Sequence, residues 1–107
     1  MSDAFKDRQK GFEGKWARDA ELRFKVVARR NKLLGLWAAG EMGLDDSKSK
    51  EYAMAVVQAD FEEAGDEDVF RKVRSDLDAS TSDAAIRAKM DELLAVAGEQ
   101  IVSEAGK

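Results

Sequence analysis

The sequence predicts an all-α protein, a four-helix bundle with a mobile or marginally helical N-terminal segment. Three observations support this prediction. The 107 residues contain no proline, the residue that usually interrupts helices and punctuates loops. Apolar residues recur at helical spacing along most of the chain, and no stretch of useful length has the pattern of a strand. The connections between the helical stretches are short, which favours antiparallel neighbours around one modest core.

The first long helix is expected to run from Trp16 to Ala39. An apolar stripe of this stretch is expected to face the core, namely Leu22, Val26, Val27, Leu33, Leu34, Trp37 and Ala38. Gly40 is the expected stop, because glycine readily adopts the left-handed conformation that ends many helices. The loop that follows includes Gly43 to Asp46.

The second helix is expected to begin near Asp46 or Ser47, either of which can cap it, and to continue to about Glu63. Gly65 is the expected stop. Its apolar positions form two adjacent rows, which contain Ala53, Val57 and Phe61 in one and Tyr52 and Val56 in the other.

The last two helices are separated by a polar break at residues 80–83. Asp66 is the expected N-cap of the third helix, whose apolar face contains Phe70, Val73 and Leu77. Ser80 and Asp83 have the spacing of a capping box for the fourth helix. The fourth helix has the most regular apolar stripe, expected to be core rather than a ligand site: Ile86, Met90, Leu93, Leu94, Ala97 and Ile101.

Residues 1–19 are expected to form an N-terminal segment distinct from the bundle of residues 20–107. Three aromatic residues recur there at helical spacing, namely Phe5, Phe12 and Trp16. Gly11 and Gly14 each cost about 1 kcal/mol in a helix interior relative to alanine. Two interpretations stand. The segment is flexible when free and becomes helical against a partner, or it is a frayed end whose aromatic side chains cap the bundle.

Charge is unevenly distributed along the chain. Residues 1–32 contain ten basic and five acidic side chains, a net +5, and residues 33–107 contain eight basic and seventeen acidic ones, a net −9. The basic third could meet an anionic partner, or the two halves of the protein could simply attract each other. Charge alone favours the second interpretation.

Several classes of function are disfavoured by the residues that the chain lacks. It has no cysteine, and therefore no disulfide and no thiolate nucleophile. It also has no histidine, which is the commonest general base and the commonest transition-metal ligand in proteins. We expect no catalytic residues and no metal site. A calcium loop counted from Asp60 fails, since Ala64 and Arg71 occupy two ligand positions. No signal peptide or membrane-spanning run is evident, so a cytoplasmic location is expected.

A basic run in the first helix is the clearest candidate for binding an anion. Arg29, Arg30 and Lys32 offer three cations to a phosphate, of a nucleic acid or of a nucleotide. The pI of about 4.9 argues against nucleic acid, and Asp19 and Glu21 interrupt the basic face that a membrane surface would need. Protein binding survives best, and the three cations remain candidates for nucleotide binding.

Two long stretches resemble the hallmark segments of the alphaproteobacterial inhibitor of the F-type ATP synthase, the zeta subunit family. They are residues 28–40 (ARRNKLLGLWAAG) and residues 59–73 (ADFEEAGDEDVFRKV). The opening from Phe5 to Trp16 resembles the N-terminal inhibitory segment of that family more loosely. Helix order and length also fit, so the resemblance spans essentially the whole chain.

The resemblance implies an inhibitor of ATP hydrolysis whose N-terminal segment enters the catalytic head and blocks rotation. The alpha, beta and gamma subunits would be its partners, and it would lie at the inner membrane through the ATP synthase, without direct membrane insertion. On this hypothesis the contacts to the head come from Phe5, Lys6, Arg8, Lys10, Phe12, Lys15 and Trp16. The aromatic residues would fill apolar gaps and the cations would pair with acidic groups.

Two alternatives remain. Some members of the family are thought to bind adenine nucleotides, so the chain could be a helical ATP- or ADP-binding regulator with little inhibitory activity. Arg29, Arg30 and Lys32 would then hold the phosphates. The other is a helical protein associated with nucleic acid, whose binding would collapse as salt is raised.

Overall fold

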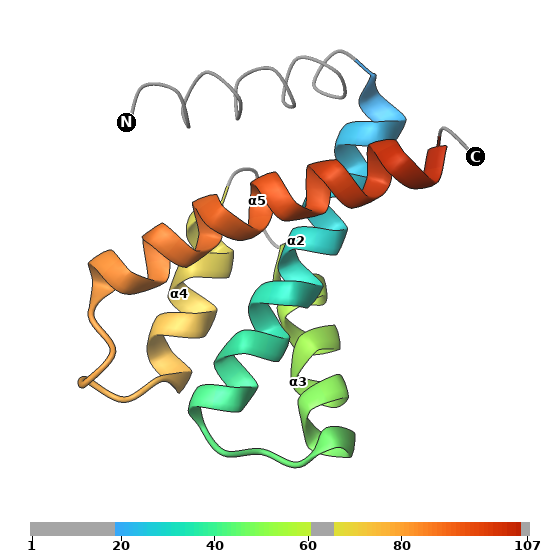
Figure 1. The fold of residues 1–107 in the computed structure, drawn as a ribbon. Coiled ribbons are helices and arrows are strands. Elements are labelled where there is room, and N and C mark those ends of the chain that lie inside the picture. The colour runs from blue at the N-terminus through green and yellow to red at the C-terminus, as the bar shows by residue number, and fades with distance from the viewer. Residues whose placement is uncertain (1–18, 61–65, 106–107) are drawn as a thin grey trace.

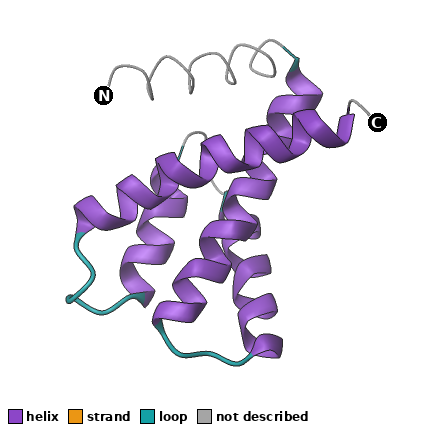
Figure 2. Cartoon of the chain, in the orientation of Figure 1, coloured by secondary structure: helices purple, strands orange, loops and turns teal. Residues whose placement is uncertain are grey.

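The computed structural model describes residues 19–60 and 66–105 of the chain. These ranges fold into four helices: α2 (Ala20–Glu41), α3 (Asp46–Ala59), α4 (Glu67–Asp76) and α5 (Asp83–Ala105). They contain no strand (Figure 2), and none of their helices has the length and apolar content needed to cross a membrane. The predicted all-α, four-helix fold is confirmed. Helix α2 begins at Ala20, after the extended N-cap residue Asp19, so the predicted start at Trp16 was wrong. The rest of the N-terminal segment and the positions of Phe61 and Gly65 lie outside the described residues.

Helix α2 is the centre of the arrangement, because it contacts each of the other three helices. Figure 1 shows α2 and α3 side by side and antiparallel, with α4 running back in the direction of α2. Helix α5 lies across α2 and α4, so that its C-terminal end lies beside the start of α2. Residues near both ends of the described chain are therefore brought together.

Two apolar clusters hold the helices together. The larger one joins all four helices and contains Leu34, Ala38, Val56, Val69, Phe70, Val73, Leu77, Ile86 and Met90, with Trp37, Met42, Tyr52 and Leu93 packed against it. The smaller one joins the first half of α2 to the end of α5 and contains Val26, Ala97 and Ile101, with Leu22, Leu33, Leu94 and Val102 around it. The predicted stripe of α5 is core, as expected, and it serves both clusters.

The end of α2 differs from the prediction, which placed the stop at Gly40. The helix continues to Glu41, and Gly43, with φ of 72°, is the residue in the left-handed conformation. The N–H of Gly43 donates to the carbonyl of Gly40 (3.1 Å), and the N–H of Leu44 donates to the carbonyl of Ala39 (3.0 Å), a Schellman termination. Continuing past Gly40 also lets Met42 pack against the larger cluster.

The predicted caps of two other helices were also wrong. The carboxylate of Asp45, not Asp46 or Ser47, caps α3 by accepting from the N–H of Lys48 (2.8 Å). At the start of α5 the hydroxyl of Ser82 accepts from the N–H of Ala85 (3.1 Å), so Ser80 and Asp83 do not form a capping box. Asp83 instead pairs with Arg74 at 2.9 Å. Helix α3 ends at Ala59, before the predicted end at Glu63.

The backbones of α2 and α3 come into very close contact at Gly35. A Cβ added at this buried glycine would lie 2.6 Å from the Cα of Ala53 and 3.2 Å from its Cβ. Only a glycine opposite an alanine allows the two helices this separation. Gly35 is therefore required for packing, whereas Gly40, in the same helix, faces open space.

We expect Gly35→Ala to lower the free energy of unfolding by about 1–3 kcal/mol, because the helices must separate to admit the methyl group. Gly40→Ala is the matched control, and it should stabilise the protein by up to about 1 kcal/mol through helix propensity alone. Urea denaturation followed by circular dichroism measures both. A Gly35→Ala protein as stable as the original would contradict the close packing of α2 and α3.

Candidate functional site

The residues predicted to contact a partner all lie outside the described residues: Phe5, Lys6, Arg8, Lys10, Phe12, Lys15 and Trp16. The basic run of α2 is described, and the structure separates its three cations. Arg29 faces α5, where its guanidinium donates to Gln100 (2.7 Å) and makes two hydrogen bonds to Glu104 (2.9 and 3.0 Å). Arg30 is buried, and Lys32 is exposed.

Arg30 is the centre of a buried polar network. Only 2% of its side chain is exposed, and its Nη2 donates to Asp66 at 2.7 Å. Its Nε donates to the Oδ1 of Asn31, also at 2.7 Å, and Asn31 is fully buried. Asp68 is buried nearby, and its carboxylate accepts from the N–H of Val69. Because Asp66 is the N-cap residue of α4, the network joins α2 to the start of that helix.

Asp66 lies at the expected N-cap position but does not cap α4 with its side chain. Its carboxylate is taken by Arg30 instead. The carboxylate that was expected to cap the helix therefore connects two helices, because a buried guanidinium needs an anion, while the N–H of Val69 in the first turn is satisfied by the side chain of Asp68.

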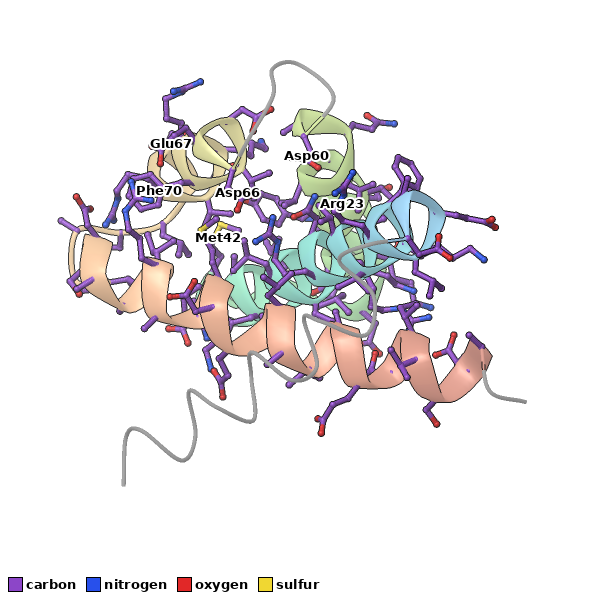
Figure 3. The ribbon with its side chains drawn as sticks, turned by 90° about the horizontal axis from the view of Figure 1, so that it is seen from above. Arg23, Met42, Asp60, Asp66, Glu67 and Phe70 are labelled. Atoms are coloured by element: carbon purple, nitrogen blue, oxygen red, sulfur yellow. The ribbon has the colours of Figure 1, made fainter. Side chains whose placement is uncertain are left out.

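Asp60, the C-cap of α3, lies at the edge of this network. Burial raises the pKa of its carboxyl, and the negative charges of Asp68 and Asp66 raise it further. The amide of Asn31 and the guanidinium of Arg30 oppose the rise without cancelling it. Figure 3 shows Asp60 and Asp66 at neighbouring ends of α3 and α4, on the same side of the molecule. Asp66 pairs with the buried guanidinium of Arg30, and the charge of the same guanidinium also acts on Asp60.

A second polar contact joins α3 to α4 but offers no catalytic group. The hydroxyl of Tyr52 donates to Asp76 at 2.8 Å, and Lys72 pairs with the same carboxylate at 2.9 Å. Burial, and then the hydrogen bond and charge of Asp76, raise the pKa of Tyr52. The phenol therefore stays protonated at neutral pH and does not serve as a general base. In the described ranges, no three acidic side chains gather in a geometry that could hold a metal ion.

A surface groove of about 460 Å³ lies where α2, α3 and α5 meet. Its apolar lining comes from Phe24, Ala28, Val57 and Ile101, and its charged lining comes from Lys25, Arg29, Lys32 and Glu104. The structure therefore brings Arg29 and Lys32 to one surface and leaves Arg30 out of it. Phe24, which is 61% exposed, was missed in the sequence. The signal was present, since Phe24 lies on the face of the helix opposite Leu22 and Val26.

A small cavity of about 30 Å³ adjoins this groove, and the two share Phe24, Ala28 and Val57. Val27, Asn31 and Asp60 complete its lining. The Nδ2 of Asn31 makes no hydrogen bond of regular geometry to the described residues, although its amide interacts with the carboxylate of Asp60 strongly enough to oppose the rise in the pKa of that group. The cavity is large enough for one water molecule, and it connects the groove to the buried network.

We expect Asp66→Ala to lower the free energy of unfolding by about 2–3 kcal/mol, because it leaves the buried Arg30 without its anion. Glu67→Ala is the matched control at the next residue. Glu67 pairs with Arg87, but both side chains are at least half exposed, so its loss should cost less than about 1 kcal/mol. Equal losses in urea denaturation would contradict a structural role for the buried pair.

Asp60→Asn should raise the melting temperature at pH 7. Since the pKa of Asp60 is higher in the folded than in the unfolded protein, ionisation of this carboxyl opposes folding. This cost is absent when the pH is below the pKa of Asp60 in the unfolded protein, and it reaches its full size once the pH exceeds the pKa of Asp60 in the folded protein. The gain of Asp60→Asn should thus shrink as pH falls, and vanish near about pH 3, where both states are protonated. A gain independent of pH in thermal unfolding would contradict this assignment.

Comparisons with known proteins give the family of the chain. No curated protein matches it. It is similar to a protein whose structure was determined by solution NMR, with 52% sequence identity and a TM-score of 0.72 over 78% of this chain and 98% of that chain. The family model described as ATPase inhibitor subunit zeta matches residues 1–100. The family inferred from residues 28–40 and 59–73 is confirmed, and the chain belongs to the ATPase inhibitor subunit zeta family.

Proposed function

We propose that this protein inhibits ATP hydrolysis by the F-type ATP synthase, by inserting residues 1–19 into the catalytic head and blocking rotation. The observation that supports this most is the extent of the family match, which covers residues 1–100 and so includes the predicted inhibitory segment as well as the bundle. The protein acts by binding and performs no reaction of its own.

In this proposal the head is contacted by the segment's aromatic and basic residues. Phe5, Phe12 and Trp16 fill apolar gaps between the alpha and beta subunits and against the gamma subunit. The cations pair with acidic groups, and they are Lys6, Arg8, Lys10 and Lys15. Because Gly11 and Gly14 weaken the isolated helix, ordering the segment consumes part of the binding free energy, which keeps the inhibition reversible.

The bundle is the folded domain to which that segment is attached. Helix α2 begins at Ala20, directly after it, and the carboxylate of Asp19 caps the helix by accepting from the N–H groups of Glu21 (2.9 Å) and Leu22 (3.1 Å). The bidentate contact of Arg29 with Glu104 ties this first half of α2 to α5. A segment anchored in the head would therefore hold the bundle against it, at the cytoplasmic side of the inner membrane.

The alternative function, binding of ATP or ADP by the bundle, is a second proposal. Arg30 is buried against Asp66, so the phosphates would be bound by Lys32 and by Arg29, and Arg29 would have to exchange its contact with Glu104 for the phosphate. The observation in its favour is that both cations line one groove with the exposed ring of Phe24.

The inhibitory proposal is tested by ATP hydrolysis of the isolated catalytic head of the same organism, with the full chain or a chain lacking residues 1–19. We expect inhibition by the full chain and none by the truncated one. Circular dichroism must show that the truncated chain keeps its helices.

Inhibition that survives the truncation would contradict the role of residues 1–19. If the full chain does not bind the head, inhibition itself is contradicted. A saturable rise in melting temperature with ATP or ADP would then support the nucleotide-binding alternative.

A further inference from the structure

We propose that the groove between α2, α3 and α5 docks an acidic, amphipathic helical segment of the partner protein, as a second contact independent of residues 1–19. This inference rests on the proposed function for the identity of the partner, the catalytic head. The groove itself is defined by described residues alone.

The apolar part of this surface is unusually exposed. Phe24 on α2 is 61% exposed and Met54 on α3 is 54% exposed, and these are the large hydrophobic side chains most exposed among the described residues. Val57, which lines the groove, lies one helical turn from Met54 and on the same face of α3. Met54 is not part of the groove lining, so the apolar surface that the groove offers is the exposed ring of Phe24 with Ala28 and the half-buried Val57. An exposed aromatic ring beside further apolar side chains is typical of a binding surface.

The charges along the groove determine the chemistry of its occupant. Lys25, Arg29 and Lys32 follow one another at helical spacing and form a row about 10 Å long on α2. Lys25 is paired with Glu21 and Arg29 with Glu104, so Lys32 is the member of the row for which no ion pair is found among the described residues, and the groove lining stays net positive in a protein whose net charge is −4. An occupant that presents carboxylates along one edge and apolar side chains beneath them is complementary to both features.

The length of the row favours a helix as the occupant. Two turns of a docked helix match a row of this length, with apolar anchors at helical spacing toward Phe24 and Val57. A nucleic acid is a poorer fit, because Glu104 lies within the groove and Glu21 pairs with Lys25 at 3.3 Å. These carboxylates would repel an occupant that carries a phosphate at every position, whereas a helix can place its few carboxylates beside Lys32 and leave both ion pairs in place.

The groove is also well placed for a second contact. Phe24 and Lys25 lie within two turns of Asp19, the residue where the N-terminal segment ends. A partner that holds residues 1–19 is therefore already concentrated near this surface, so even a weak contact adds substantially to the total affinity.

The test compares two groove variants with a matched control, using full-length protein. Lys32→Glu reverses one charge of the row, and Phe24→Ala removes the exposed ring. Lys50→Glu makes the same charge reversal at an exposed lysine near the start of α3, away from the groove. Binding to the catalytic head is measured by fluorescence anisotropy, and ATP hydrolysis is measured in parallel.

We expect Lys32→Glu and Phe24→Ala to weaken binding to the head roughly tenfold each, while Lys50→Glu changes it less than about twofold. Maximal inhibition at saturating protein should stay unchanged, because residues 1–19 are intact. All variants should melt like the original protein, since the substituted side chains are exposed.

Affinities for the head that are alike in all three variants would overturn the docking surface and leave the inhibitory proposal standing. Binding that responds to the groove variants without any inhibition would support the docking surface and overturn the inhibitory role. If sedimentation shows a dimer that both groove variants abolish, the groove belongs to a second copy of this chain and the inference is wrong. A failure of the head to bind the original protein would overturn both proposals.

Discussion

The ion pair between Arg30 and Asp66 is the contact on which the rest of the arrangement depends. A guanidinium that is 2% exposed costs several kcal/mol to desolvate, so the chain must place an anion beside it. Asp66 meets this need from the first residue before α4, and thereby fixes where that helix starts relative to α2. The charge of Arg30 also opposes the rise in the pKa of Asp60, so one side chain of α2 interacts with carboxylates at both ends of the α3–α4 connection.

Gly35 imposes the second constraint, five residues further along the same helix. Its close approach to Ala53 brings α3 against α2, so that Ala53 and Val56 are buried while Val57 remains at the rim of the groove. Helix α2 thus presents a buried cation, an interhelical contact and an exposed basic row within a few turns. One helix therefore has both a stable buried face and an accessible face, which suits a bundle that must keep its conformation while a partner binds.

Much of the fold follows from residues that can be read directly. The stripe that contains Ile86, Met90 and Ala97 predicts α5, and the absence of proline together with short connections predicts four helices. The ends of the helices were harder to predict, since Gly40 and Gly43 are both suited to the left-handed conformation that ends a helix. Asp45 and Asp46 are likewise both good caps. Local propensity does not decide which of two adjacent residues ends or caps a helix, because the difference lies in which apolar side chains then reach the core.

By itself the sequence determined the helical class, the apolar faces and the family, because each depends on spacing or on residue identity over long stretches. The tertiary structure alone decided the roles of the basic run. Arg29, Arg30 and Lys32 are equivalent as cations in a sequence, but a helix turns each by about 100° from the next residue. Arg29 therefore pairs with Glu104, Arg30 is buried against Asp66, and Lys32 is exposed in the groove. Which neighbour each side chain finds depends on helices distant in the chain, and no local pattern contains that information.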